Sequence, residues 1–149
     1  MKLVDYASHN SDVSMTTIGR LVGDESHREI RITVTPTERR LEILGGYDET
    51  VLNSTSYPNT QSAYENFLSA LARQGFTSKK DSTISDPRGV CPTGNRYIYD
   101  LSDGGSHVSN IWSSSCDKNG TFAGHGPTIR ELFRQQIPDY TKQITGVTL

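Results

Sequence analysis

Cys91 and Cys116 are the residues whose type most directly suggests chemistry, because the chain contains no other cysteine. Between them, Gly104-Gly105 is the kind of dipeptide that joins two antiparallel strands in a two-residue turn. With a turn at these glycines, Tyr97 pairs with Trp112, and both cysteines lie at the open end of one hairpin. We therefore predict a disulfide, which would contribute about 3 kcal/mol by closing a loop of about 26 residues.

The hairpin and its thiols have alternatives. A turn at Asp103-Gly104 would place Cys91 directly opposite Cys116. The thiols could also be free in a cytoplasmic protein, or one of them could act as a nucleophile with His107 or His125 as its base. Neither cysteine belongs to a CxxC or HxxxH pattern, so we assign no metal site.

The histidines and carboxylates suggest little catalytic chemistry. His125 lies in the glycine-rich stretch GHGP, where the backbone could present a side chain to a ligand, and a small enzyme with a site near His125 is one hypothesis. Asp100 and Asp103 flank a turn, where aspartate is favoured for local reasons. The chain contains no GxSxG, P-loop or GxGxxG pattern, so we predict no catalytic residue and no cofactor.

Two loops at the open end of the hairpin, 77–89 and 117–127, are better candidates for recognition. The residues that we select as candidate binding residues are Arg88, His107, Trp112 and His125. The hairpin with Cys91-Pro92, Trp112 and Cys116 is similar to that of bacterial proteinaceous protease inhibitors, although this chain lacks the second disulfide expected in that group. An inhibitor-like module that presents the Arg88 loop is therefore a second hypothesis.

Hydrophobic periodicity indicates the elements that would hold these residues. Apolar and polar residues alternate within 28–44, which predicts an antiparallel hairpin with one buried face, and 14–23 and 49–57 read as further strands. Segments 60–74 and 128–137 have apolar residues on one helical face and Ser, Thr or Asn near their starts. We predict an α+β fold: an antiparallel β-meander packed by an amphipathic helix, then a disulfide-closed β-hairpin and a C-terminal helix.

Length and composition predict one domain. The chain has 149 residues, of which we assign 1–12 to a flexible N-terminal lead-in and 13–149 to a single α+β domain. The net charge is −2 and the only basic pairs are Arg39-Arg40 and Lys79-Lys80, which excludes a nucleic-acid-binding surface. No apolar run reaches the roughly 20 residues that span a bilayer, so we expect no transmembrane segment.

These features favour a non-enzymatic, extracytoplasmic binding or accessory domain. A disulfide is typical of proteins in oxidising compartments, and we expect a secreted or lipoprotein-type protein whose export leader has been removed. A cytoplasmic location is the alternative if the thiols are free. The partner would be a protein or a small molecule, and the sequence identifies neither this ligand nor the oligomeric state.

Overall fold

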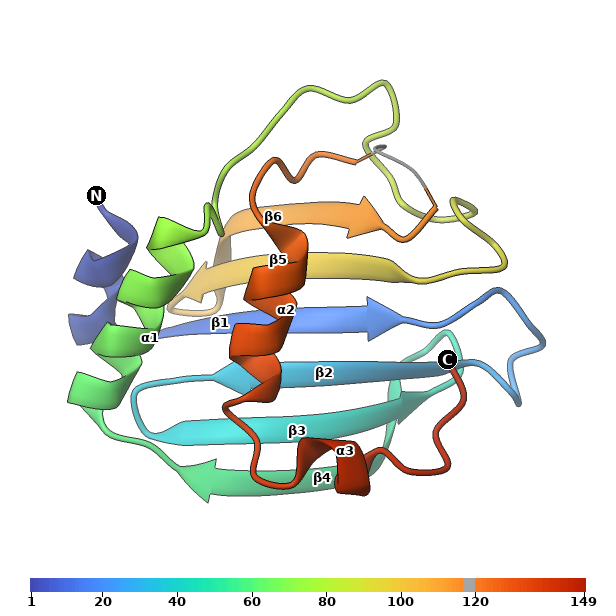
Figure 1. Ribbon diagram of the computed structural model, residues 1–149, viewed down its shortest axis with the longest axis horizontal. Helices are drawn as coiled ribbons and strands as arrows, with labels where there is room; N and C mark the ends of the chain where they lie inside the picture. The colour runs from blue at the N-terminus through green and yellow to red at the C-terminus, as the bar shows by residue number, and fades with distance from the viewer. Residues whose placement is uncertain (117–119) are drawn as a thin grey trace.

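The structure is a computed structural model that describes residues 1–116 and 120–149 (Figure 1). One six-stranded antiparallel sheet has the order β4-β3-β2-β1-β5-β6. In chain order the elements are η1 (Leu3–Ser8), β1 (Ser11–Ile18), β2 (Arg28–Val34), β3 (Glu38–Gly45), β4 (Thr50–Pro58), α1 (Gln61–Arg73), β5 (Arg96–Asp103), β6 (Ser106–Ser114), α2 (Gly126–Arg134) and α3 (Tyr140–Gln143). The predicted α+β fold is confirmed.

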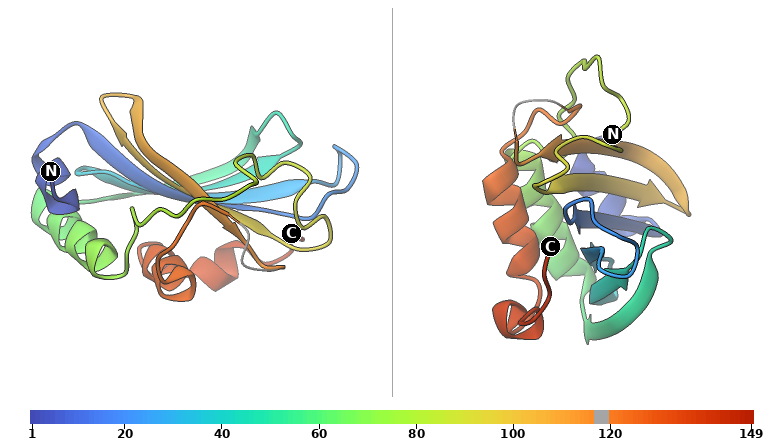
Figure 2. Two further views of the ribbon diagram at one scale, coloured as in Figure 1. Left: turned by 90° about the horizontal axis from the view of Figure 1, so that it is seen from above. Right: turned by 90° about the vertical axis from the view of Figure 1, so that its right-hand side faces the viewer.

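The core lies between one face of the sheet and the helices. Figure 2 shows α1, α2 and α3 on the same side of the sheet, so the opposite face has no helical cover. Alternate residues of the strands point to the helices, as the period of two requires. Met15 and Ile32, which pair across β1 and β2, are both buried there, and the rings of Phe67 and Phe133 join α1 to α2 at 5.1 Å.

Helix α1 begins after a capping residue, and α2 begins at a proline-containing turn. Thr60 caps α1 by accepting a hydrogen bond from the backbone N–H of Ala63, within the predicted segment 60–74. Helix α2 begins at Gly126, two residues before the predicted start, because Pro127 suits the first turn of a helix. The helix ends at Arg134 and not at the predicted Ile137, although Ile137 is still buried in the core.

The N-terminal segment differs from the predicted lead-in. Residues 3–8 form the 3-10 helix η1, and Leu3 and Ala7, spaced four apart, are buried by it. Strand β1 begins at Ser11, whose hydroxyl lies 2.8 Å from the hydroxyl of Tyr64 on α1. Burial of two small apolar side chains and one buried hydrogen bond therefore attach this segment to the fold, a signal too weak to recognise in a polar stretch.

The β5–β6 hairpin corrects the predicted register. The turn lies at Gly104-Gly105 as predicted, with φ of 59° and 85°, and Ser102 pairs with His107. A bulge then shifts the register, so Ile98 and not Tyr97 lies opposite Trp112, and the predicted pairing along the rest of the hairpin is wrong. Val108 is the residue left unpaired. The shift by one residue places Trp112 on the face away from the helices.

The cysteines form the predicted disulfide. Cys91 and Cys116 are bonded, and their Cα atoms are 5.6 Å apart. Cys91 adopts a left-handed φ of 53° in the turn before β5, and a Cβ at Gly94 would lie 2.6 Å from the sulfur of Cys91. Residue 94 therefore has to be glycine for the bridge to pack. Within the described part of the chain, no helix combines the length and apolar character that crossing a membrane requires.

Candidate functional site

The face of the sheet away from the helices carries a polar depression of about 510 Å³. It is formed by the side chains that alternate with the buried core residues of β1, β2, β3, β5 and β6. Ile98 is the one apolar side chain among those that line it. The others are Asp12, Ser14, Thr16, Arg31, Thr33, Thr35, Arg40, Glu42, Asp100, Ser102, His107 and Asn110. We refer to this set of residues as the polar depression.

Asp100 is the centre of a hydrogen-bond network in the depression. Asp100 is only 7% exposed, and its carboxylate accepts bonds from Ser102 Oγ at 2.7 Å and Asn110 Nδ2 at 2.8 Å. His107 Nδ1 lies 2.5 Å from the same carboxylate, which requires the proton to be on Nδ1 because an ionised carboxylate only accepts. The network therefore fixes the imidazole of His107, which remains largely exposed.

The network is not a Ser–His–Asp triad, although it contains all three residue types. In a triad the serine faces the imidazole nitrogen opposite the one that the aspartate binds. Here Ser102 Oγ donates to Asp100 and lies 3.3 Å from Nδ1 of His107, the nitrogen that faces Asp100. The arrangement therefore orients polar groups at a surface without creating an activated serine.

Asp12 lies beside this network without joining it. It is on β1 opposite Ser102, one diagonal step from Asp100 on the same face. Its pKa is raised, mainly by burial and further by the negative charge of Asp100, while Arg40 and His107 act in the opposite direction. The side chain of Asp12 makes no hydrogen bond or close ion pair with any residue of 1–116 or 120–149.

The two arginines of the depression are already paired. Arg31 donates to Glu49 at 2.6 Å and to the hydroxyl of Thr16 at 2.8 Å. Arg40 forms ion pairs with Glu38 and, at 3.3 Å, with Glu42. Each positive charge is therefore balanced by a carboxylate at the edge of the site.

Beyond the depression, the same face has a covered polar row. Ile18 pairs with Glu29 on one side and with Arg96 on the other, and Arg96 pairs with Ser114. Glu29 Oε1, Arg96 Nε and Ser114 Oγ are the buried side-chain atoms of the described residues that have no ordinary hydrogen-bond partner. All three lie in this one row, beneath loops joined by a 2.8 Å bond from Leu21 N to Pro92 O.

The protonated form of Glu29 explains how its carboxyl group can be buried in this polar row. Its pKa is raised to about 8, first by burial and then by a hydrogen bond to the carboxyl group of Glu49. Two carboxyl groups can share a hydrogen bond only when one of them is protonated, and burial favours the neutral form of Glu29. Glu29 Oε2 is 2.8 Å from Nε2 of the buried His27, on which the ring of Tyr47 stacks at 4.0 Å.

The structure separates the four predicted binding residues. Arg88 is exposed and paired with Asp86, whereas Trp112 is buried and donates to the carbonyl of Ser85 at 3.1 Å, so the loop that carries Arg88 covers Trp112. His107 lies near the hairpin turn in the polar depression. His125 immediately precedes α2 and makes no capping bond with its side chain.

The sequence pattern did not identify the carboxylates or the single amide, Asn110, of the depression. Asp12 was assigned to the lead-in, and Asp100 was interpreted as a turn residue. Alternation in 11–17 and 96–102 would have placed both on one face, because Val13 and Leu101 pair in the core. Asn110 could not be placed, because the bulge at Val108 changes which face it occupies.

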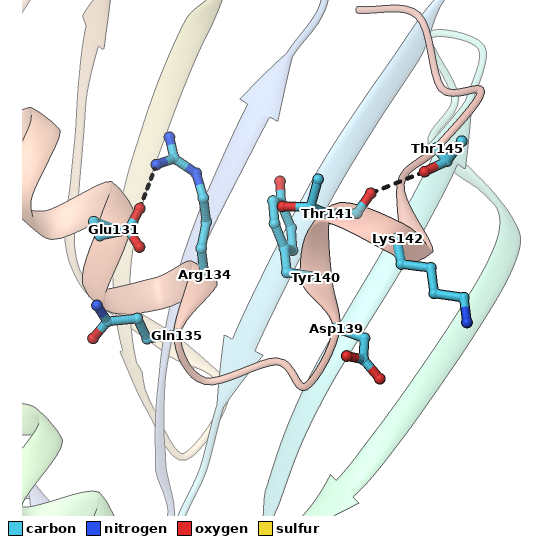
Figure 3. A pocket seen from close by; sticks show the side chains of 8 residues that line it. All are labelled: Glu131, Arg134, Gln135, Asp139, Tyr140, Thr141, Lys142 and Thr145. Carbon is cyan, nitrogen blue, oxygen red and sulfur yellow. Dashed lines mark hydrogen bonds and ion pairs between the residues drawn. The ribbon is translucent and has the colours of Figure 1, made fainter.

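A second depression, of about 580 Å³, lies between the end of α2 and α3 (Figure 3). Glu131 and Arg134 pair at 3.0 Å on its wall, while Asp139 and Lys142 point away from that pair. Its polar groups do not converge on one point, so it is a weaker candidate than the polar depression.

Among residues 1–116 and 120–149, no three His, Cys, Asp or Glu side chains gather closely enough to hold a metal ion. The chain matches no protein-family model and no curated protein sequence.

Proposed function

We propose that this protein is a non-enzymatic, extracytoplasmic binding domain, secreted or of the lipoprotein type, and that the polar depression binds its ligand. One observation carries the proposal: a buried carboxylate, Asp100, holds Ser102, His107 and Asn110 in place on a sheet face without helical cover. Buried polar groups of this kind position the polar atoms that give a binding site its specificity.

Two features support binding over catalysis. Within residues 1–116 and 120–149, no serine or cysteine is hydrogen-bonded to the second nitrogen of the oriented His107 imidazole, since Ser102 faces Nδ1 and both cysteines are in the disulfide. The carboxyl groups of Asp12 and Asp100 lie in different environments. Hydroxyl groups are the only candidate nucleophiles among the described residues that line the depression. A rigid sheet with preset hydrogen-bonding groups suits recognition of a polar molecule.

The extracytoplasmic location rests on the disulfide. Disulfides persist in oxidising compartments and are rare where thiols are kept reduced. A domain of this size that uses a bridge to hold a loop and a hairpin together fits a secreted or surface-anchored protein.

The inhibitor hypothesis has weaker support. Arg88 precedes Gly89, with φ of 79°, in a turn closed by a 3.0 Å bond from Val90 N to Pro87 O. Its guanidinium is tied to Asp86. A protease binds its substrate in an extended conformation, so this turn would have to open before Arg88 entered a specificity pocket.

The proposal is tested by amide chemical-shift changes in the 15N-labelled protein, titrated with a panel of monosaccharides, amino acids and polyamines. We expect the changes to gather on Ser14, Asp100 and Asn110. Asp100→Asn, which cannot accept the same three bonds, should weaken binding by at least about tenfold, whereas Glu65→Gln on the exposed side of α1 should not. If no compound moves these amides, or if the changes gather at α3, the proposal is wrong.

A further inference from the structure

We infer that the ligand of the polar depression is a small hydrophilic molecule carrying an ammonium or guanidinium group, and that Asp12 binds this cation. The inference rests on the proposed function and adds the chemical class of the ligand. It follows from the pairing of the charged side chains: Arg31, Arg40 and Asp100 have partners, whereas the side chain of Asp12 accepts no hydrogen bond from the described residues.

The positive charges of the depression already have carboxylate partners. Arg31 is held by Glu49 at 2.6 Å, and Arg40 lies between Glu38 and Glu42. An anionic ligand would have to compete with these carboxylates, whose negative charges stay beside the site, whereas a cationic ligand would not.

The two aspartates of the depression differ in the hydrogen bonds that their side chains accept. Asp100 accepts hydrogen bonds from Ser102, His107 and Asn110, so both of its oxygens have partners. Asp12 has none among the described residues, although it is half buried and lies near Asp100. Burial and the negative charge of Asp100 raise the pKa of Asp12, and the positive charges of Arg40 and His107 offset only part of that rise. A cationic group placed against Asp12 would offset the remaining rise, and this makes Asp12 the charge that a ligand can complete.

The neighbours of Asp12 are matched to a ligand rich in N–H and O–H donors. The amide nitrogen of Asn110 is used by Asp100, which leaves its carbonyl oxygen as an acceptor. Ser14 and Thr33 add hydroxyls that line the same depression. Amino sugars and basic amino acids carry a cation and several donors within the size that a depression of about 510 Å³ admits.

A metal ion fits the site less well than an organic cation. Calcium takes six to eight oxygen ligands, with several carboxylates among them. No cluster of three His, Cys, Asp or Glu residues able to hold a metal occurs within the described ranges 1–116 and 120–149. An ammonium or guanidinium group needs only one carboxylate and a few acceptors.

The test compares each cationic ligand with a neutral analogue of nearly the same size. Glucosamine is titrated against glucose, and arginine against citrulline, with amide shifts of the 15N-labelled wild type as the readout. We expect each cation to bind at least about tenfold more tightly than its neutral partner, the range for a charge-assisted hydrogen bond. Asp12→Asn should remove the difference, and the matched change Glu65→Gln on α1 should preserve it.

The outcomes separate this inference from the proposed function. Shifts on the polar depression with equal affinity for charged and neutral partners would overturn the cation inference and leave the binding function standing. Stronger binding by an anion or by Ca²⁺ at the same residues would also overturn it. No shift at these residues with any compound would remove both proposals. The comparison within the wild type decides the inference even if Asp12→Asn does not fold.

Discussion

Glu29 shows how one buried side chain makes stability depend on pH. Its carboxyl group is held between His27, Glu49, Arg31 and Arg96, and the same network fixes the turn that carries Glu49 at a left-handed φ of 57°. Burial, together with the hydrogen bond to Glu49, keeps the proton on Glu29. Folding therefore favours the protonated form of this group.

The first prediction concerns Glu29→Gln. The pKa of Glu29 is about 8 in the folded protein against 4.5 for the free group, so the folded state binds more protons between these values. The free energy of unfolding should fall as the pH rises from about 4.5 to about 8, by up to about 1 kcal/mol per pH unit. The substituted side chain stays neutral and keeps an amide group in the network, so the variant should lose this dependence and be more stable at pH 7.

Urea unfolding at pH 5, 6, 7 and 8 measures this effect, with Glu65→Gln as the control for loss of one negative charge. Parallel stability profiles for the wild type and Glu29→Gln would contradict the shared proton between Glu29 and Glu49.

At the scale of elements, η1, α3 and the pairing of the last two strands could not be predicted, whereas the strands and the helices α1 and α2 could. Local patterns were sufficient to predict these elements. Apolar residues alternate in β2 and β3, and they gather on one face of α1. No local pattern marks the bulge at Val108. Valine is as apolar as the residues that form the core, and yet Val108 is half exposed. The polar depression depends on that bulge, since it places His107 and Asn110 on one face.

The second prediction concerns the element that the disulfide closes. Replacing Cys91 and Cys116 together by serine should lower the free energy of unfolding by about 3 kcal/mol, because the open loop gains conformational freedom in the unfolded chain. The sheet should still form, since β5 pairs along its length with β1. Unfolding in urea with and without reductant measures the effect. Equal stability of the wild type before and after full reduction would show that the bridge contributes nothing.

At the scale of the whole molecule, two differently built faces share one sheet. The helical face is held by aromatic packing, as in the stacked rings of Tyr99 and Phe122 at 4.2 Å, while the other face keeps its polar groups in hydrogen bonds. The long connection from α1 to β5 runs past the β6 edge (Figure 1), and its first part is tied to residues 121–123 by backbone bonds. Its later part carries Arg88, whose side chain is 89% exposed, outside these backbone bonds.

That difference gives the third prediction, on limited proteolysis by trypsin. Arg88 is 89% exposed at its side chain, whereas the backbone at Lys79 and Lys80 pairs with Phe122 and Thr121. Trypsin must open several residues around its target into an extended form, which the Arg88 turn permits more readily than a paired segment does. We expect the first cut after Arg88, measured by mass spectrometry, with no stoichiometric loss of trypsin activity.

The variant Arg88→Gln should delay the first cut, and it is the matched control because it keeps a long polar side chain and the turn. After the cut, β1 still pairs with β5 across the two fragments, so the nicked protein should keep its fold until it is denatured. Stoichiometric inhibition of trypsin that is lost in Arg88→Gln would instead support the inhibitor hypothesis. The function would then lie in the loop of residues 77–89 and not on the polar face of the sheet.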